Sequence, residues 1–275
     1  GVTGVYGVDF PKPTGHIAKG TYFVDSAPDG SVLLSSIVSD LCRRTPLQPA
    51  QIDVSELTDP VLGYGVGSQM AARNALAPLA QAFFFDVVET GALLRFVKRG
   101  TGTVAELSRD EIGAGEDTAA ESTAEHTRAQ ETELPTVVNV AYAAVDADYE
   151  TGTQTARRRV SSSEQAMSVE LPLVLTDQQA SDIAAVLLYD VWTARTQSAV
   201  SVMRQWSNLE PTDVIEFGDG QLTYRIRVAD IENDGPVIKL LGFDSDPRPT
   251  HPRPCRARRR AAARRNRALS GVTDA

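Results

Sequence analysis

Closely spaced acidic residues are the first side chains in this sequence that could do chemistry. Asp146 with Asp148, and Asp213 with Glu216, are the residue types that a glycosidase pair or a cation site would use. All but one of the 36 acidic residues of the chain lie before residue 248, however, so close pairs are expected by chance. We interpret both pairs as solvated strand ends, and the sequence assigns no catalytic residue.

The glycines at positions 63–67 resemble a phosphate-binding loop only in part. Gly63, Gly65 and Gly67 form G-x-G-x-G, which lacks the spacing of dinucleotide-binding loops. We predict instead a strand over 62–66 whose glycines permit close packing. The histidines and cysteines have no second ligand at metal spacing, so no metal, cofactor or disulfide is expected from His16, His126, His251, Cys42 and Cys255.

The net charge of −9 hides two regions of opposite sign. Residues 248–275 contain nine arginines and one acid, Asp274, and this balance of +8 leaves −17 for residues 1–247. Because a surface of that sign repels phosphate, we expect no nucleic-acid binding by the folded part. The Arg-rich segment, residues 246–275, is predicted to be disordered. It could be a polyanion-binding arm, but we prefer to interpret it as the frameshifted end of a GC-rich gene.

Targeting and membrane signals are the next feature of the chain. No run of residues approaches the roughly 18 apolar positions of a membrane-spanning helix. The first ten residues have neither the basic start nor the apolar middle of a signal peptide. The chain begins with Gly1 rather than Met, so we expect it to be part of a longer protein.

Two amphipathic helices are predicted after an irregular N-terminal segment, residues 1–30. Apolar residues recur at helical spacing behind Ser31 and again behind Ser68, which we expect to be N-caps. Pro78 falls inside the second helix, where it should produce a kink or a restart.

A β-hairpin and a linker follow these helices. Two apolar runs flank Thr90-Gly91-Ala92, a turn signal, and complete a small α-β-α-β-β module over 31–100. Residues 101–134 are rich in Ala, Thr and Gly and contain nine acidic residues. Such a segment cannot bury enough apolar surface to offset the entropy of ordering, so we expect an acidic linker or loop there.

Residues 135–245 are predicted to form an antiparallel β-barrel-like domain with one long helix against its side. Thr176 and Gln179 make a capping box, and apolar residues at helical spacing continue from it, so the helix is expected over 176–195. The remaining segments alternate with a period of two and are joined by Gly- and Asp-containing turns. The fold class is therefore α+β.

A tight corner is predicted just before one of these strands. Pro211 presets a turn dihedral, and the carboxylate of Asp213 can accept local amide hydrogen bonds. Trp206 precedes the corner and is expected to be a core residue. This structural corner is the candidate site of the chain, and it consists of Trp206, Leu209, Glu210, Pro211 and Asp213.

The corner also carries a resemblance to a known family. Together with residues 194–202, the corner is similar to a corner motif of tail-tip and baseplate hub proteins, which occur in long-tailed bacteriophages and gene transfer agents. In those proteins the motif reads Leu, then Glu or Lys, then Pro, Gly, Asp and Val. Similar segments are spread over about 31–243, and they are Leu33–Cys42, Gly63–Tyr64, Phe85–Glu89, Arg128–Pro135, Asp148–Gln154 and Glu170–Thr176.

This resemblance implies a structural, non-enzymatic protein of the tail tip or baseplate hub, which closes the tail tube and links it to the host-recognition apparatus for DNA delivery. It implies a homotrimer in the virion tail, assembled in the host cytoplasm and bound to other tail-tip and tail-tube proteins. DNA would only pass through the lumen, where an acidic wall would repel its phosphates. Contact with the host surface would belong to the full-length protein.

One alternative stays open beside the hub: a carbohydrate-active or cell-wall hydrolase module of the same tail tip. A cleft with two carboxylates about 5–10 Å apart would favour that alternative.

Two positions depart from the family pattern. Thr212 stands where the family has its turn glycine, and Phe84 stands where the family has glycine before Phe-Asp. A β-branched residue resists the positive φ of a type II turn. We therefore expect the corner either to take another form or to bear strain.

Overall fold

In the computed structural model the described residues are 31–100, 102–112, 124–159, 162–218, 222–234 and 237–245, with three short strands before residue 31. The rest of the N-terminal segment 1–30 and the whole Arg-rich segment 246–275 lie outside the described residues, as does 113–123 of the expected acidic linker.

The first sheet joins the two halves of the chain. Its six strands run in the order β1-β3-β7-β15-β13-β14, in which β13 and β15 are parallel and the other neighbours are antiparallel. They are β1 (Val5–Tyr6), β3 (Thr21–Phe23), β7 (Gly63–Val66), β13 (Val137–Ala144), β14 (Thr151–Arg157) and β15 (Ala166–Leu175). Pro172 interrupts β15 where its pairing with β13 shifts register, which is where a sheet tolerates proline.

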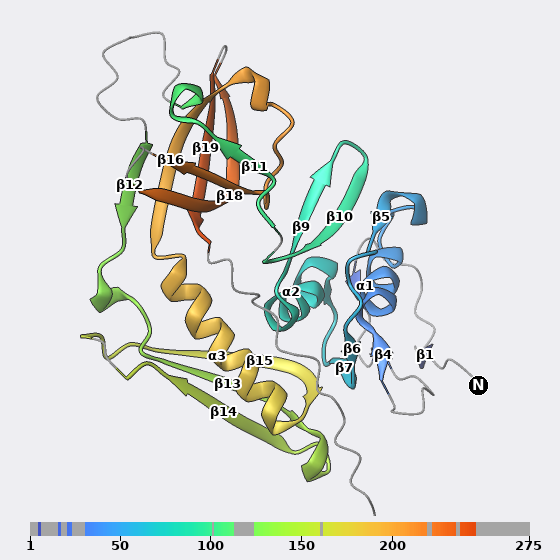
Figure 1. Ribbon diagram of the computed structural model, residues 1–275. Helices are drawn as coiled ribbons and strands as arrows, with labels where there is room; N and C mark the ends of the chain where they lie inside the picture. The colour runs from blue at the N-terminus through green and yellow to red at the C-terminus, as the bar shows by residue number, and fades with distance from the viewer. Residues whose placement is uncertain are drawn as a thin grey trace, which may run out of the picture.

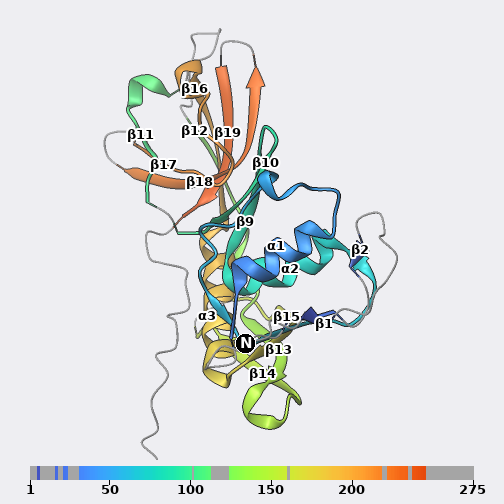
Figure 2. The same ribbon diagram turned by 90° about the vertical axis from the view of Figure 1, so that its right-hand side faces the viewer.

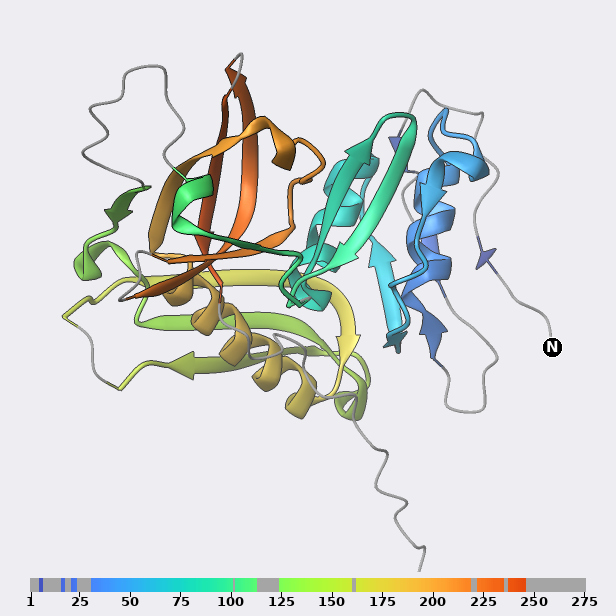
Figure 3. The ribbon, with the colours of Figure 1, turned by 45° about the horizontal axis from the view of Figure 1, so that its top comes forward.

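The helix α3 (Asp177–Thr193) lies across β13 and β14 of the first sheet (Figure 3). Thr176 accepts a hydrogen bond from the Gln179 amide, 3.3 Å long, and the Gln179 side chain accepts one from the Thr176 amide, 2.9 Å long. The predicted capping box is confirmed. Alternate residues of β13 are buried under the helix, because a strand presents every second side chain to one face.

Two further helices, α1 (Leu34–Arg43) and α2 (Ala72–Phe83), pack against each other, and α2 also contacts β15. The expected caps at Ser31 and Ser68 are wrong: the N-cap positions are Leu33 and Ala71, and neither makes a side-chain cap bond. The reason is tertiary, because the short strands β4 (Val32–Leu33) and β8 (Met70–Ala71) run directly into these helices. Pro78 is accommodated within the single helix α2.

The β-hairpin is confirmed as β9 (Phe85–Thr90) and β10 (Leu93–Lys98). Thr90 pairs with Leu93, and Gly91 in the two-residue turn has a φ of 62°, a conformation that favours glycine. β5 (Ile52–Asp53) adds to β10 in parallel. Two small pairs complete this part, and they are β2 (His16–Ile17) with β8, and β4 with β6 (Pro60–Val61).

The second sheet also has six strands, in the order β11-β17-β18-β19-β16-β12. They are β11 (Ala105–Leu107), β12 (Ala124–Arg128), β16 (Thr196–Met203), β17 (Val214–Gly218), β18 (Thr223–Asp234) and β19 (Val237–Asp244). All neighbours are antiparallel except β11 and β17. The turns expected at 218–220 and 233–235 extend into residues 219–221 and 235–236, which lie outside the described residues.

Within the described ranges, the second sheet curls without closing into a barrel. A bridge between Ile112 and Val202 brings the segment after β11 to β16, near the other end of the sheet. The α+β class is confirmed, and the long helix packs on β13 and β14, two strands of the predicted 135–245 region (Figure 1). The strands of that region are divided between the two sheets, and α3 covers the first sheet only. Short 3₁₀ turns connect the strands at Pro49–Gln51, Arg109–Glu111, Glu131–Glu133, Val145–Ala147 and Arg204–Trp206.

The described residues form two separate hydrophobic clusters. The first core contains buried residues from Leu34 to Trp192, and the second core contains buried residues from Ala105 to Leu240. Residues 135–193 thus contribute to the first core rather than to a unit of their own with the later strands. The expected module boundaries, including one within 101–134, stay a prediction.

Candidate functional site

The corner residues form a compact hydrogen-bonded turn. The Glu210 amide donates to Oδ2 of Asp213 at 2.9 Å, and the Asp213 amide donates to the Glu210 carbonyl at 3.2 Å across Pro211. The Leu209 amide donates to the Trp206 carbonyl at 3.1 Å, and the Leu209 side chain is buried in the second core. The arrangement positions the side chain of Glu210 at the start of β17.

Thr212 adopts the conformation that its residue type resists. Its φ is 82°, and its amide donates to the Val228 carbonyl at 2.7 Å, while the Val228 amide donates to the Asp213 carbonyl at 2.8 Å. Phe84, the other departure from the family pattern, has a φ of 51° at the end of α2. Both positions keep a glycine-like backbone without a glycine, and such outliers persist only where the surroundings impose them.

Glu210 binds the β9–β10 hairpin. Its Oε1 accepts a hydrogen bond from Oγ1 of Thr90 at 3.1 Å, and its Oε2 accepts one from Nη1 of Arg95 at 3.0 Å. Burial raises the pKa of the neighbouring Asp213, and the negative charge of Glu210 raises it further. The hydrogen bond from the Glu210 amide and the positive charge of Arg95 lower this pKa, but the net shift is upward. The corner therefore joins the second sheet to the hairpin.

A second polar contact lies at the base of the hairpin. We call Asp86, Arg99, Asp190 and Arg227 the arginine cluster. Arg99 binds Asp86 through two hydrogen bonds of 3.0 and 2.8 Å, and its Nη1 donates to Asp190 of α3 at 2.9 Å. Nη1 of Arg227, on β18, contacts the same Asp86 carboxylate. Each side chain is about a quarter exposed, at 21–26%.

The electrostatics around Arg99 favour its charged form. Burial alone would lower the pKa of Arg99, but the hydrogen bonds and charges of Asp86 and Asp190 outweigh it and raise that pKa. Two parallel bonds between a guanidinium and a carboxylate also fix the relative orientation of the two groups. The cluster thus holds three elements, the hairpin, α3 and β18, in one arrangement.

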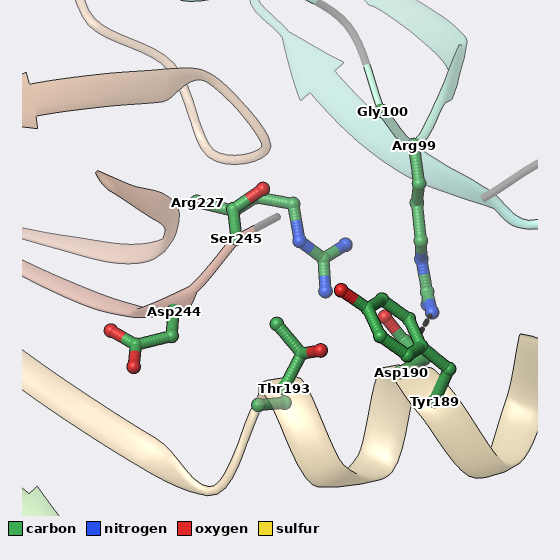
Figure 4. Close-up of a pocket in the computed structure, with 9 residues that line it drawn as sticks. Arg99, Gly100, Tyr189, Asp190, Thr193, Arg227, Asp244 and Ser245 are labelled. Carbon is green, nitrogen blue, oxygen red and sulfur yellow. Dashed lines mark hydrogen bonds and ion pairs between the residues drawn. The ribbon is translucent and has the colours of Figure 1, made fainter. Parts of the chain in front are cut away.

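A small cavity adjoins this cluster. Figure 4 shows Arg99 and Arg227 directed toward it, with Tyr189, Thr193 and Ser245 around it. Its volume is about 20 Å³, which suffices for about one water molecule. A site for a sugar or a cofactor needs several hundred Å³.

The acidic pairs are engaged in separate contacts. Oε1 of Glu216 accepts hydrogen bonds from Oγ1 of Thr103 at 2.6 Å and from Nη1 of Arg225 at 3.3 Å, whereas Asp213 binds within the corner. Asp146 and Asp148 lie exposed at the turn between β13 and β14. Within the described ranges, no group of three or more His, Cys, Asp or Glu residues could hold a metal ion.

The remaining candidates have structural positions. A Cβ on Gly63 would lie 2.8 Å from Cγ2 of Val174, so the glycine permits close packing of β7 on β15. His126 stacks on Tyr224, with ring centroids 4.4 Å apart, and its Nδ1 lies 2.8 Å from Oγ of Ser198. Burial raises the pKa of Cys42 to about 11, so its thiol is unreactive at neutral pH. His251 and Cys255 lie outside the described residues.

The arginine cluster was not predicted from the sequence. Arg99 and Arg227 stand 13 and 141 residues from Asp86, and Asp190 is 91 residues from Arg99. Asp86 lay in the Phe-Asp segment of the family resemblance and Asp190 in the predicted helix, but neither signal indicated an ionic partner. Local spacing cannot reveal partners that are so distant along the chain.

Residues 71–231 match the model of the protein family described as "Putative phage tail protein". The chain belongs to this family. The match takes in α2, the hairpin, α3, the corner and the arginine cluster, so the polar contacts described above lie within the family region.

Solved structures of tail proteins have a similar fold. A chain of the virion of a native gene transfer agent particle is 26% identical, with a TM-score of 0.71 over 79% of this chain and 48% of that one. The tail protein of Neisseria meningitidis MC58 has a TM-score of 0.56 at 11% identity, over 82% of this chain and 70% of its own. The prophage MuSo2 43 kDa tail protein of Shewanella oneidensis has a TM-score of 0.53 at 13% identity, over 89% and 69%.

The chain spans about half the length of the gene transfer agent protein that it matches. A comparison with curated protein sequences gave no match. Among the described residues, every helix of this phage tail protein is too short or too polar to cross a bilayer.

Proposed function

We propose that this phage tail protein is a structural component of the tail-tip or baseplate hub, which closes the tail tube and links it to the host-recognition apparatus. The observation that carries the proposal is its likeness to a chain of a gene transfer agent virion, at 26% identity over 79% of its length with a TM-score of 0.71. That chain is part of a virion, and the family that this chain belongs to is described as a phage tail protein, so we place this chain in the virion tail.

The proposed protein acts by enclosing and connecting rather than by catalysis. It assembles as a homotrimer, binds tail-tube and other tip proteins, and lets DNA pass along an acidic wall. The charge of −17 over residues 1–247 supports this arrangement, because a wall of that sign does not hold phosphates. The cavity of about 20 Å³ beside the arginine cluster is too small for the sugar that a hydrolase module would bind.

Imaging of particles tests the hub proposal directly. The gene would be deleted from the phage or gene transfer agent cluster that encodes it, and particles would be examined by electron microscopy with and without the full-length gene supplied in trans. We expect tubes without tips after deletion, and normal tips after complementation. Normal tips in the deletion strain, or a tagged protein spread along the tube, would contradict the proposal.

Two assays on the purified chain address the finer points. Light scattering coupled to size-exclusion chromatography should give about three times the chain mass of 29.6 kDa. A peptidoglycan digestion assay should show no activity, whereas turnover of the polymer would favour the hydrolase alternative.

A further inference from the structure

The two cores are joined by few chain connections. In the described part of the chain these are 102–104, between the hairpin and β11, then 129–136, between β12 and β13, and 194–195, between α3 and β16. The second and third are bound to each other, since the Ala129 amide donates to the Arg195 carbonyl at 2.9 Å. In Figure 1 both run on the left of the junction.

The hairpin bridges the junction on the other side. It is anchored in the first core by Phe85 and Phe96, whose rings meet edge to face with centroids 5.9 Å apart. Figure 2 shows it between the second sheet and the α1–α2 pair. Its side-chain contacts with the second sheet include two ionic ones, from Asp86 to Arg227 and from Arg95 to Glu210.

The chemistry of these contacts differs from that of the cores. A packed apolar core has one arrangement, because moving it exposes surface and opens voids. An ionic contact at a partly exposed site can separate and re-form, because water solvates the freed charges. Asp86 is shared by two guanidinium groups, so it can leave Arg227 and still be paired with Arg99.

Backbone strain lies beside both ionic contacts. Phe84, with a φ of 51°, precedes Asp86 by two residues, and Thr212, with a φ of 82°, follows Glu210 by two. The Phe84 carbonyl also accepts a hydrogen bond from the Arg99 amide at 2.8 Å. The fold therefore holds the two carboxylates by backbone turns that glycine would adopt more easily.

We propose that the β9–β10 hairpin is an ion-pair latch that sets the angle between the two cores. Asp86 with Arg99 and Arg227 forms one contact of the latch, and Glu210 with Arg95 forms the other. The bound connections at 129–131 and 194–195 form the hinge about which the cores turn when the latch opens. This inference does not depend on the hub role, because it concerns the isolated chain.

Distances between spin labels test the latch in the full chain. Labels at the exposed positions Thr153 on β14 and Glu232 on β18 report the separation of the two sheets, after Cys42→Ala and Cys255→Ser remove the native thiols. We expect one narrow distance distribution in the labelled parent, because the closed latch holds one angle.

Three latch variants and one control follow in that background. Asp86→Asn and Arg95→Glu should each broaden the distribution or add a second distance, and Arg95→Glu with Glu210→Arg should restore the narrow one. The control is Arg157→Glu, which makes the same charge change as Arg95→Glu at an exposed position on β14 and should leave the distance distribution narrow. Circular dichroism shows whether each variant folds, and the Arg95 pair keeps the test open if Asp86→Asn does not.

Amide exchange gives a second measurement. Opening of the latch should make amides of β9 and β10 exchange about tenfold faster in Arg95→Glu, as for loss of one charge-assisted contact. Folded variants that keep the narrow distribution and the parent exchange rates would overturn the latch. A double variant as broad as Arg95→Glu would overturn it as well, because pairing would then not be the cause.

Discussion

The two cores of this tail protein bury apolar surface in different ways. The first core is layered, with α3 over β13 and β14, and the hairpin adds the aromatic rings of Phe85 and Phe96 to it. The second core, as far as its residues are described, is built from strands and turns of one curled sheet. The first core therefore depends on helices packed against a sheet, whereas the second depends on side chains that the strands and turns of one curled sheet enclose.

Removing one large side chain from each core should have the largest effect. Phe85→Ala should lower the free energy of unfolding of the first core by about 3–5 kcal/mol, and Ile215→Ala should lower that of the second by about 2–5 kcal/mol, because each leaves a cavity at a fully buried position. The chain has two tryptophans, Trp192 in the first core and Trp206 against the second, so urea titrations of Trp206→Phe and Trp192→Phe backgrounds follow each core separately.

Each substitution should shift mainly the fluorescence transition of its own core. Identical shifts of both transitions would show that the cores unfold as one unit, so that their stabilities are not separate.

Adding one methyl group should distinguish the cores by what it meets. A Cβ on Gly242 would lie 2.7 Å from the Arg227 carbonyl, whereas a Cβ on Gly63 would meet the side chain of Val174 at 2.8 Å. Both alanine variants should lower the free energy of unfolding by about 1–3 kcal/mol. Gly242→Ala should lower it more, because a paired strand cannot move aside as a side chain can. Gly67→Ala is the control, since nothing lies within 4 Å of its Cβ. Equal losses at the three positions would contradict the backbone argument.

The helix cap is important to the first core alone. Thr176→Ala should lower the free energy of unfolding of that core by about 1 kcal/mol, because the Gln179 amide loses its acceptor. Thr176→Ser keeps the acceptor and should lose much less. The measurement is thermal unfolding followed by Trp192 fluorescence, and a matching shift at Trp206 would indicate that α3 supports both cores.

Relief of backbone strain should have the smallest effect and the opposite sign. Thr212→Gly should stabilise the second core by about 0.5–1 kcal/mol, because glycine adopts a φ of 82° without the clash of a β-branched side chain. Thr127→Gly, on the exposed edge strand β12, is the control and should destabilise slightly. Urea unfolding followed by Trp206 fluorescence measures both. A loss of stability in Thr212→Gly would mean that the corner does not bear strain.

Much of the local structure could be predicted from the chain itself. Thr176 and Gln179 predicted the start of α3, and Thr90-Gly91-Ala92 predicted the hairpin. A helix cap and a tight turn can be predicted in this way because each depends on residues a few positions apart. The glycine-like backbone at Thr212 was anticipated as one of two outcomes. The caps at Ser31 and Ser68 failed because short strands, formed with distant partners, set where α1 and α2 begin.

What the sequence determined by itself was the α+β class, the family resemblance, the long helix and the turn at Pro211, since each follows from local propensity or from segment similarity. Only the tertiary structure decided that α3 covers the first sheet, that residues on either side of 101–134 share the first core, and that Asp86, Arg99, Asp190 and Arg227 meet. The physical reason is sequence separation, because charges that meet across as many as 141 residues leave no periodic pattern along the chain.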